Sequence, residues 1–418
     1  MTAATVKPRC GDLMSLHLGE PAALADARRG FWPVAAMFAV MQVGGAIPIT
    51  LWVIWQQRLD FSTGTLALVF AVYTLGTLIS LILFVPLSDQ IGRRPALFVS
   101  IGLAVASTAL YLAVDNLVLL FLARFVSGMA VALTTGSGAA ALRELEPHSN
   151  ARRASLVTTA ATLGAIGLGP LLAGVLAQYT AHPLTLVFWI YLALLAGASV
   201  CVGYAHETVT VTEHVRWTPN RLALPARARI AFAVAAAGGF CAFALLGLFS
   251  SVVPSFLGSA LHERNHAIAG AIVSTIFIAA TIAQLLLFRL SPTHALALGL
   301  PLLLVGLALI ELGLWQASLP IFLTGTIASG VAVGLTFMGS LATVNQIAEP
   351  DRRAQILAAY FVACYSGIAL PAIAVGEAAN SVGAKDATLL CAIALTAVIL
   401  LALSAIRAPV PARPRFSA

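Results

Sequence analysis

About twelve apolar stretches run through this chain, and each is long enough to cross a bilayer as a helix, which takes roughly 20 residues. They lie at 32–55, 64–86, 95–114, 117–142, 156–179, 184–204, 230–256, 267–290, 295–314, 319–344, 355–378 and 386–407. Hydrophobic residues make up 60% of the chain and charged residues 9%, too few for a water-facing surface. The stretches are apolar on all sides, unlike the alternating strands of a membrane barrel. We therefore predict an all-α integral membrane protein.

Basic residues are spread unevenly between the two sides of the predicted membrane. If the N-terminus is cytoplasmic, most of the 23 Lys and Arg residues fall in cytoplasmic loops, whereas Arg58, Arg264 and Lys385 lie on the other side. This bias predicts cytoplasmic N- and C-termini in a cell inner membrane. It also accounts for the net charge of +7, so we expect the lipid bilayer and no nucleic acid as partner. Residues 1–30 lack an apolar run, and we expect the first span to direct insertion.

A long polar interruption divides the chain into two halves. Residues 205–229 contain four arginines, two prolines and no apolar run, which is typical of an inter-domain linker. We predict a cytoplasmic tail at 1–30, a bundle of about six helices at 31–204, a cytoplasmic linker, a second such bundle at 230–407 and a cytoplasmic tail at 408–418.

The two halves share a short repeated pattern. Residues 146–154 and 349–354 both contain Glu-Pro followed by Arg-Arg-Ala, and each is followed by a span that carries a proline, Pro170 or Pro371. Parallel repeats of this kind occur in membrane transporters.

The charged turn between the second and third spans is the most specific motif. It reads Leu87-Ser-Asp89-Gln-Ile-Gly92-Arg93-Arg94-Pro-Ala-Leu97. Gly92 permits a positive φ angle in the turn, and the two arginines favour its cytoplasmic placement. The segment resembles the loop between helices 2 and 3 of the major facilitator superfamily, G-x-L-x-D-x-x-G-R-R/K-x-x-L, with Val85 in place of the first glycine.

That resemblance implies a gate. In the family's pattern Asp89 would dock against the start of helix 11, near 353–355, and lock the outward-facing state. Glu144, at the end of the fourth span, is a candidate third member of this gating motif, with Gly92, Arg93 and Arg94. The alternative is that Asp89 is a solvated loop charge.

Arg124 lies inside the fourth span, about seven residues from its start, where a charged side chain is costly and usually faces a cavity or a partner. The segment Arg124-Phe-Val-Ser127-Gly128 resembles the family element R-x-x-Q-G, with Ser127 replacing glutamine. The resemblance implies proton coupling or substrate contact for Arg124. The alternative is a side chain that snorkels to the nearer membrane surface.

The fifth span contains Gly169, Pro170 and Gly174, which resemble part of the family's element G-x-x-x-G-P-x-x-G-G, associated with proton-coupled exporters. Ala165 and Ala173 replace two of its glycines. Small residues let helices approach closely and proline removes a backbone donor, so this helix would suit a gate. Generic helix packing is the alternative.

In this family helices 1, 4, 7 and 10 face a central cavity, so the resemblance assigns candidate lining residues. They are Gln42, Trp52, Phe240, Phe243 and Thr336, with Tyr365 from a neighbouring helix. Two acids, Glu311 and Glu377, lie near the outer ends of their spans; both are interpreted as interfacial charges, although Glu377 could instead reach the cavity. With Arg124 as its main charge, the cavity would suit a neutral or anionic amphiphile.

No nucleotide-binding loop, metal-ligand spacing or nucleophile elbow occurs in the sequence, so we expect no catalytic residues, no metal and no cofactor other than the proton as coupling ion. The chain is most similar to the drug/metabolite:proton antiporter group of the superfamily. We expect a monomeric secondary transporter that exports a small organic compound by alternating access, and not an enzyme. A sugar or metabolite permease of the same fold is the alternative; outside transport, an integral-membrane enzyme or ligand sensor is less consistent with the sequence.

Overall fold

The computed structural model describes residues 30–148, 150–209, 228–251, 253, 265–348 and 353–407. The predicted tails, apart from Gly30, and most of the predicted linker lie outside these residues. The described part of the chain is helical and contains no strand. It has 12 helices that are long and apolar enough to cross a membrane.

The first half contains six of these spans. The first, Gly30–Leu59, ends in α2. The elements of this half are α2 (Pro48–Leu59), α3 (Thr63–Leu83), the short α4 (Ser88–Ile91), α5 (Arg93–Leu112), α6 (Leu117–Glu144), α7 (Ala151–Thr159), the π-helical segment η1 (Ala160–Gly164), α8 (Ala165–Tyr179) and α9 (Pro183–Tyr204). Because α7, η1 and α8 are continuous, together they form the fifth span, Arg152–Tyr179.

The second half contains the other six spans. Its helices are α10 (Arg229–Ser251), α12 (His266–Leu287), α13 (Pro292–Trp315), α14 (Leu319–Ile347), α15 (Arg353–Val382) and α16 (Ala384–Arg407). The predicted spans agree with these bounds to within a few residues at most ends.

Polar side chains begin several of the spans. Ser62 caps α3 by accepting a hydrogen bond from the backbone N–H of Thr65 at 3.2 Å, and Asn116 caps α6 through Leu119 at 3.0 Å. Such caps satisfy N–H groups that have no partner inside the helix, a need that is acute where lipid replaces water. Asn265 and Ser291 cap α12 and α13 in the same way.

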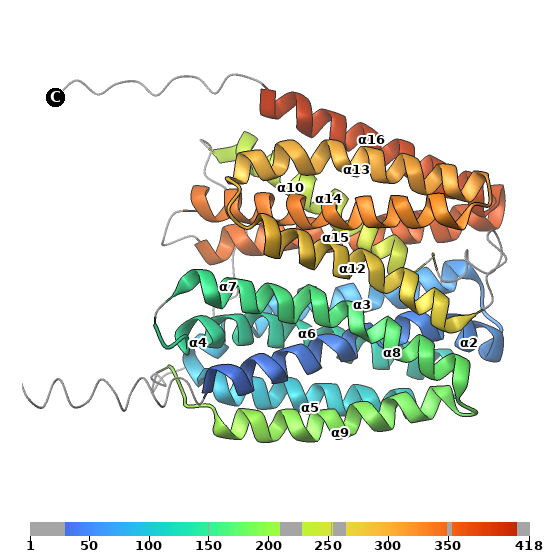
Figure 1. Ribbon diagram of the computed structural model, residues 1–418. Helices are drawn as coiled ribbons and strands as arrows, with labels where there is room; N and C mark the ends of the chain where they lie inside the picture. Colours follow the sequence, from blue (N-terminus) through green and yellow to red (C-terminus); the bar gives the residue numbers. More distant parts are fainter. Residues whose placement is uncertain are drawn as a thin grey trace, which may run out of the picture.

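The helices form two bundles, one from each half of the chain, and α9 and α16 lie at opposite outer edges of the molecule (Figure 1). One apolar core extends from Phe31 to Ala205 within the first half. A second joins α10, α12, α13, α14 and α16 and includes Ala46, Ile49 and Leu163 of the first half, so it crosses the boundary between the bundles. This arrangement confirms the predicted fold class, an all-α membrane protein of two six-helix bundles.

The bundles meet along two helix pairs. α8 packs against α12, and α3 packs against α15. Each pair joins one helix from each half, so a movement of one bundle relative to the other must change both contacts. The end of the bundles that carries Arg93, Arg94 and Arg152 is called the arginine-rich end below.

Candidate functional site

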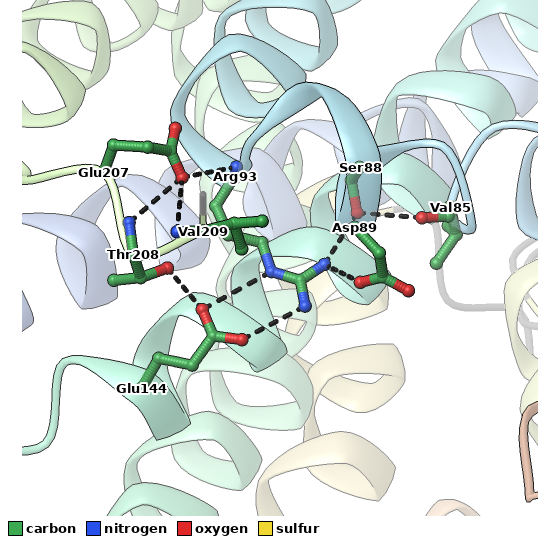
Figure 2. Close-up of polar contacts among 8 residues, drawn as sticks. All are labelled: Val85, Ser88, Asp89, Arg93, Glu144, Glu207, Thr208 and Val209. Atoms are coloured by element: carbon green, nitrogen blue, oxygen red, sulfur yellow. Dashed lines mark hydrogen bonds and ion pairs between the residues drawn. The ribbon is translucent and has the colours of Figure 1, made fainter. Parts of the chain in front are cut away.

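Arg93 organises a cluster of charges at the arginine-rich end (Figure 2). Its guanidinium forms an ion pair with Asp89 and donates from Nη2 to Glu144 Oε1 at 3.1 Å. Its Nη1 also donates to the hydroxyl of Ser88 at 2.8 Å. The side chain is 12% exposed, which strengthens these interactions relative to fully solvated ones. The structure thus brings together Asp89, Arg93 and Glu144.

Glu207, which sequence analysis missed, binds the start of α5. Its carboxylate accepts hydrogen bonds from the backbone N–H groups of Arg93 at 2.8 Å and Arg94 at 2.9 Å. Gly92 precedes them with φ of 102°, and a Cβ there would lie 2.6 Å from Glu207 Oε2. Gly92 at the N-cap of α5 has no side chain that could accept these hydrogen bonds. The sequence therefore already indicated that an acidic side chain from another segment must cap this helix.

Two further contacts tie the end of α9 and the residues after it to this cluster. The Thr208 hydroxyl donates to the Glu144 carboxylate, and Arg94 Nη2 donates to the Gly203 carbonyl at 2.9 Å. The first residues of the predicted linker therefore hold α5 and α6 together (Figure 2). The predicted docking of Asp89 on the start of helix 11 lies outside the described residues, since 349–352 and the side chains of 353–354 are not described.

Glu146 organises the turn between α6 and α7. Its carboxylate accepts backbone N–H bonds from His148 at 2.9 Å and Asn150 at 2.6 Å, and lies 3.5 Å from Arg153 Nη1. Desolvation acts to raise the pKa of Glu146, but the two backbone hydrogen bonds and the charge of Arg153 outweigh it, so the pKa is below its ordinary value. The glutamate of the repeated pattern is thus a structural anion.

Arg124 is buried inside the first bundle, at 1% exposure, and does not snorkel to the surface. Its Nη1 donates to the carbonyl of Gly45 at 3.0 Å. Three rings surround the guanidinium carbon, with centroids at 4.1 Å for Tyr73, 4.9 Å for Phe70 and 5.2 Å for Trp52. Cation–π attraction offsets part of the cost of burying this charge. Trp52, predicted as a cavity residue, is part of this aromatic cage.

A second aromatic cluster lies in the other bundle and extends toward the first. The ring of Phe243 on α10 lies 5.2 Å from Phe337 on α14 and 5.7 Å from Tyr365 on α15. Phe361 adjoins Tyr365 at 6.4 Å. Tyr365 lies on α15, which packs against α3, the helix of the first bundle that carries Tyr73. Phe243 and Tyr365 are therefore close to the boundary between bundles, as a cavity role would require.

The other predicted cavity residues are placed less favourably for that role. Thr336 is fully buried and packs against Gly238 and Gly299, inside its own bundle. The backbone of Phe240 packs closely against Gly367 of α15: a Cβ added to Gly367 would lie 2.3 Å from the Phe240 carbonyl oxygen. Gln42 is 2% exposed, and its Oε1 has no hydrogen-bond partner.

The predicted gate residues of the fifth span lie where backbones touch. A Cβ on Gly169 would lie 2.7 Å from the carbonyl oxygen of Val43, and one on Gly174 would lie 2.5 Å from that of His266. The carbonyl of Pro170 accepts a bond from Thr50 Oγ1 at 3.2 Å. The π-helical segment η1 before α8 was not predicted; such segments loosen a helix and occur frequently at functional positions.

The two intramembrane acids occupy different surroundings. Glu377 is exposed at the end of α15, and its Oε2 would lie 2.8 Å from a Cβ on Gly64, in the first turn of α3. Glu311 is 9% exposed, which does not fit the interpretation as an interfacial charge, and its Oε2 lies 3.4 Å from Thr388 Oγ1. Among the described residues, no group of His, Cys, Asp and Glu could hold a metal ion.

Comparison with solved structures finds the same architecture. The nucleoside transporter NupG, in a mutant form, superposes with a TM-score of 0.73 at 13% identity, covering 90% of this chain and 99% of that one. A bacterial homologue of the human lysosomal transporter Spinster, in an inward-facing and unoccupied conformation, gives 0.68 at 11% identity, covering 91% and 97%. At these identities the likeness concerns the fold alone.

Comparison with curated proteins finds no significant match. A family model does match: residues 34–372, most of the membrane-spanning part of the chain, fit the model of the Major Facilitator Superfamily. Together with the twelve spans and their two-bundle arrangement, this match places the chain in the Major Facilitator Superfamily of membrane transporters.

Proposed function

We propose that this transporter exports a small organic compound in exchange for protons by alternating access. The binding site would lie between the bundles, with the cage around Arg124 and Tyr73 on one side and the Phe243–Tyr365 cluster on the other. Rocking of the two bundles would expose it to each face of the membrane in turn.

The contact between α8 and α12 carries this proposal. A Cβ on Gly270 of α12 would lie 2.4 Å from the carbonyl oxygen of Pro170 on α8, so the two bundles touch there through their backbones. Contacts built from small residues can slide or separate without repacking large side chains. The π-helical segment and Pro170 in the same span add pliability on the first-bundle side.

The partial match to the exporter element at Gly169, Pro170 and Gly174 supports proton coupling and the outward direction. Proton entry supplies about 2.3 kcal/mol per charge for each 100 mV of membrane potential. The bias of basic residues supports a cell inner membrane location with the arginine-rich end in the cytoplasm. We further propose that the monomer is the transporting unit, since one chain supplies both bundles and the proposed pathway lies between them.

A metabolite permease is the second candidate. One structure with the same fold is named as a nucleoside transporter, and polar aromatic side chains such as Tyr73 and Tyr365 could stack on a nucleobase. Nucleosides therefore belong in the panel of compounds to be tested.

The test is counterflow in vesicles reconstituted with the purified protein, with internal pH recorded by a trapped dye. Export coupled to protons predicts exchange of one compound class, with acidification of the compartment that loses the compound. Uptake without any pH change would favour the permease. Flux of the same size in protein-free vesicles would show that the protein does not transport the compound.

Asp89→Asn tests the gate in the same assay. The change removes the negative charge that pairs with Arg93, and we expect a lower flux with normal membrane insertion. Asp115→Asn is the matched control, because Asp115 lies in the turn between α5 and α6, outside the cluster. Full activity of Asp89→Asn would show that the charge of Asp89 has no role in gating.

A further inference from the structure

An apolar cavity lies inside the second bundle, near the end opposite the arginine-rich end. Helices α10, α13, α14 and α16 line it, and the stacked rings of Phe249 and Phe322, with centroids 6.0 Å apart, form part of its wall. It has room for about two water molecules. Among the described residues that line it, Glu311 of α13 is the single ionisable group and Thr388 of α16 is the single other polar side chain. The cavity thus holds one carboxyl group in apolar surroundings.

Glu311 lies closer to the far end of the bundle than to the arginine-rich end. It stands four residues before Trp315, the last residue of α13, which corresponds to about 6 Å of helix. The helix begins four residues after Phe288, whose ring contacts Arg152 at the arginine-rich end, so Trp315 lies at the opposite end. The side chain is 9% exposed and is therefore not sealed off completely. A proton from the medium at that end has the shorter route to it.

No described cation compensates a negative charge on Glu311, which forms no ion pair within the described part of the chain. The helix α14, which packs against α13, has no titratable side chain. Away from the arginine-rich end, the other lining helices carry Cys241 on α10 and Lys385, Asp386 and Cys391 on α16. Of these, Lys385 alone is a cation, and it makes no ion pair with Glu311. Because a buried carboxylate without a counter-ion is costly, the cavity favours the neutral acid.

The hydrogen bonds of Thr388 also fit a protonated Glu311. A threonine hydroxyl has one proton to donate and two lone pairs that accept. Thr388 Oγ1 lies 2.9 Å from the backbone carbonyl oxygen of Lys385, which can only accept, and 3.4 Å from Glu311 Oε2. Since the shorter contact takes the hydroxyl proton, a carboxylate at Glu311 would leave two acceptors facing each other. The O–H of a protonated Glu311 can instead donate to Thr388 Oγ1.

We propose that Glu311 is a proton-binding site, which takes up one proton from the end opposite the arginine-rich end and holds it against the hydroxyl oxygen of Thr388. In this step the carboxylate accepts a proton from a hydronium ion, which becomes water, and the site changes from negative to neutral. On the proposed function, this is the proton that is exchanged for the compound, whereas proton binding itself does not require transport.

The helix α10 connects this site to the boundary between the bundles. Its Leu245 and Phe249 line the cavity, and its Phe243 belongs to the aromatic cluster of the candidate binding site. An ionised Glu311 would draw water into the cavity and loosen the packing of α10 against α13 and α16, whereas the neutral acid keeps the cavity apolar. Protonation of Glu311 and the position of Phe243 are therefore coupled through one helix.

Infrared spectroscopy of the purified full-length protein in detergent tests the site, because a protonated carboxyl group has a carbonyl stretching band that a carboxylate lacks. At about pH 6, where an ordinary glutamate is ionised, we expect this band in the wild type and its loss in Glu311→Gln. Thr388→Val keeps the shape of the side chain but removes the accepting oxygen, so it should shift the band. Asp386→Asn is the matched control, because Asp386 is exposed near the same end of α16, and it should leave the band unchanged.

Transport in reconstituted vesicles tests the role of this proton in exchange. Flux driven by an imposed pH gradient should fall at least tenfold in Glu311→Gln, whose side chain cannot take up and release the proton. Counterflow without a pH gradient should persist in this variant, because exchange of compound for compound needs no net proton movement. Asp386→Asn should respond to the gradient as the wild type does.

Two infrared results would overturn proton binding at Glu311: no carboxyl band in the wild type, or the same band in the wild type and in Glu311→Gln. If Glu311→Gln does not fold, an unshifted band in Thr388→Val would overturn it as well. Equal gradient-driven flux in the wild type and in Glu311→Gln would show that this proton is not the exchanged one. Absence of any transport by the wild type would instead contradict the proposed function and leave the infrared result standing.

Discussion

The guanidinium of Arg152, in α7, lies 3.9 Å from the centroid of the Phe288 ring, which follows α12. This contact joins the two bundles at the arginine-rich end, beside the same helix pair that meets through Pro170 and Gly270 nearer the other end. The pair α8 and α12, extended by α7, is therefore held at both ends in this conformation.

Removing the Phe288 ring should weaken closure at the arginine-rich end. Phe288→Leu keeps an apolar side chain but loses the cation–π attraction, which is worth about 0.5–1 kcal/mol at an exposed site. We expect transport rates to change by about twofold to fivefold, the factor that this energy corresponds to. A double-mutant cycle with Arg152→Gln checks the assignment: the second change should add nothing to the first. Additive effects of the two changes would mean that the residues act separately.

Adding a methyl group to Gly270 should force α8 and α12 apart. The Cβ of Gly270→Ala would lie 2.4 Å from the backbone oxygen of Pro170, an approach that real structures do not show, so one helix must shift. We expect a large loss of transport together with greater accessibility of the boundary to water-soluble thiol reagents, read at a cysteine that replaces the buried Ser274 of α12. Gly102→Ala is the control, because no atom lies within 4 Å of its added Cβ. Normal transport by Gly270→Ala would show that this contact is not needed for closure.

Arg124→Ala should reduce transport more than Arg143→Ala does. Both arginines belong to α6, but Arg124 is caged by aromatic rings within the bundle and Arg143 is exposed. Loss of Arg124 leaves an empty space in a packed interior and removes its bond to Gly45. We expect at least a tenfold loss of flux at unchanged protein level in the membrane. Equal losses in the two variants would argue that Arg124 has a structural role only.

Glu146 should make the protein less stable as the pH falls. Its pKa in the folded state is below the ordinary value of 4.5, so it stabilises the fold above that pH, and the contribution disappears as the pH falls through the lowered pKa. Glu146→Gln should lower the thermal midpoint at pH 7, and the midpoints of the variant and the wild type should converge as the pH falls below 4.5. A difference that stays constant over this range would mean that the carboxylate charge does not contribute.

The fold followed closely from the sequence because hydrophobicity along the chain is a local property. Each run of about 20 apolar residues must satisfy its backbone hydrogen bonds internally once lipid surrounds it, and only a helix does so within one segment. The predicted spans therefore agree with the helices of the structure, and the motif around Gly92 and Arg93 indicated the family that the comparison then identified.

The composition of the candidate sites depended on contacts between distant segments, which the local pattern does not contain. Glu207 reaches the start of α5 from more than a hundred positions later in the chain, so only the folded bundle reveals it as a cap. The cage around Arg124 likewise draws Trp52, Phe70 and Tyr73 from two other spans. The sequence determined which segments cross the membrane, because lipid selects helices one at a time; tertiary structure decided which side chains meet, because helix packing sets their rotation and depth.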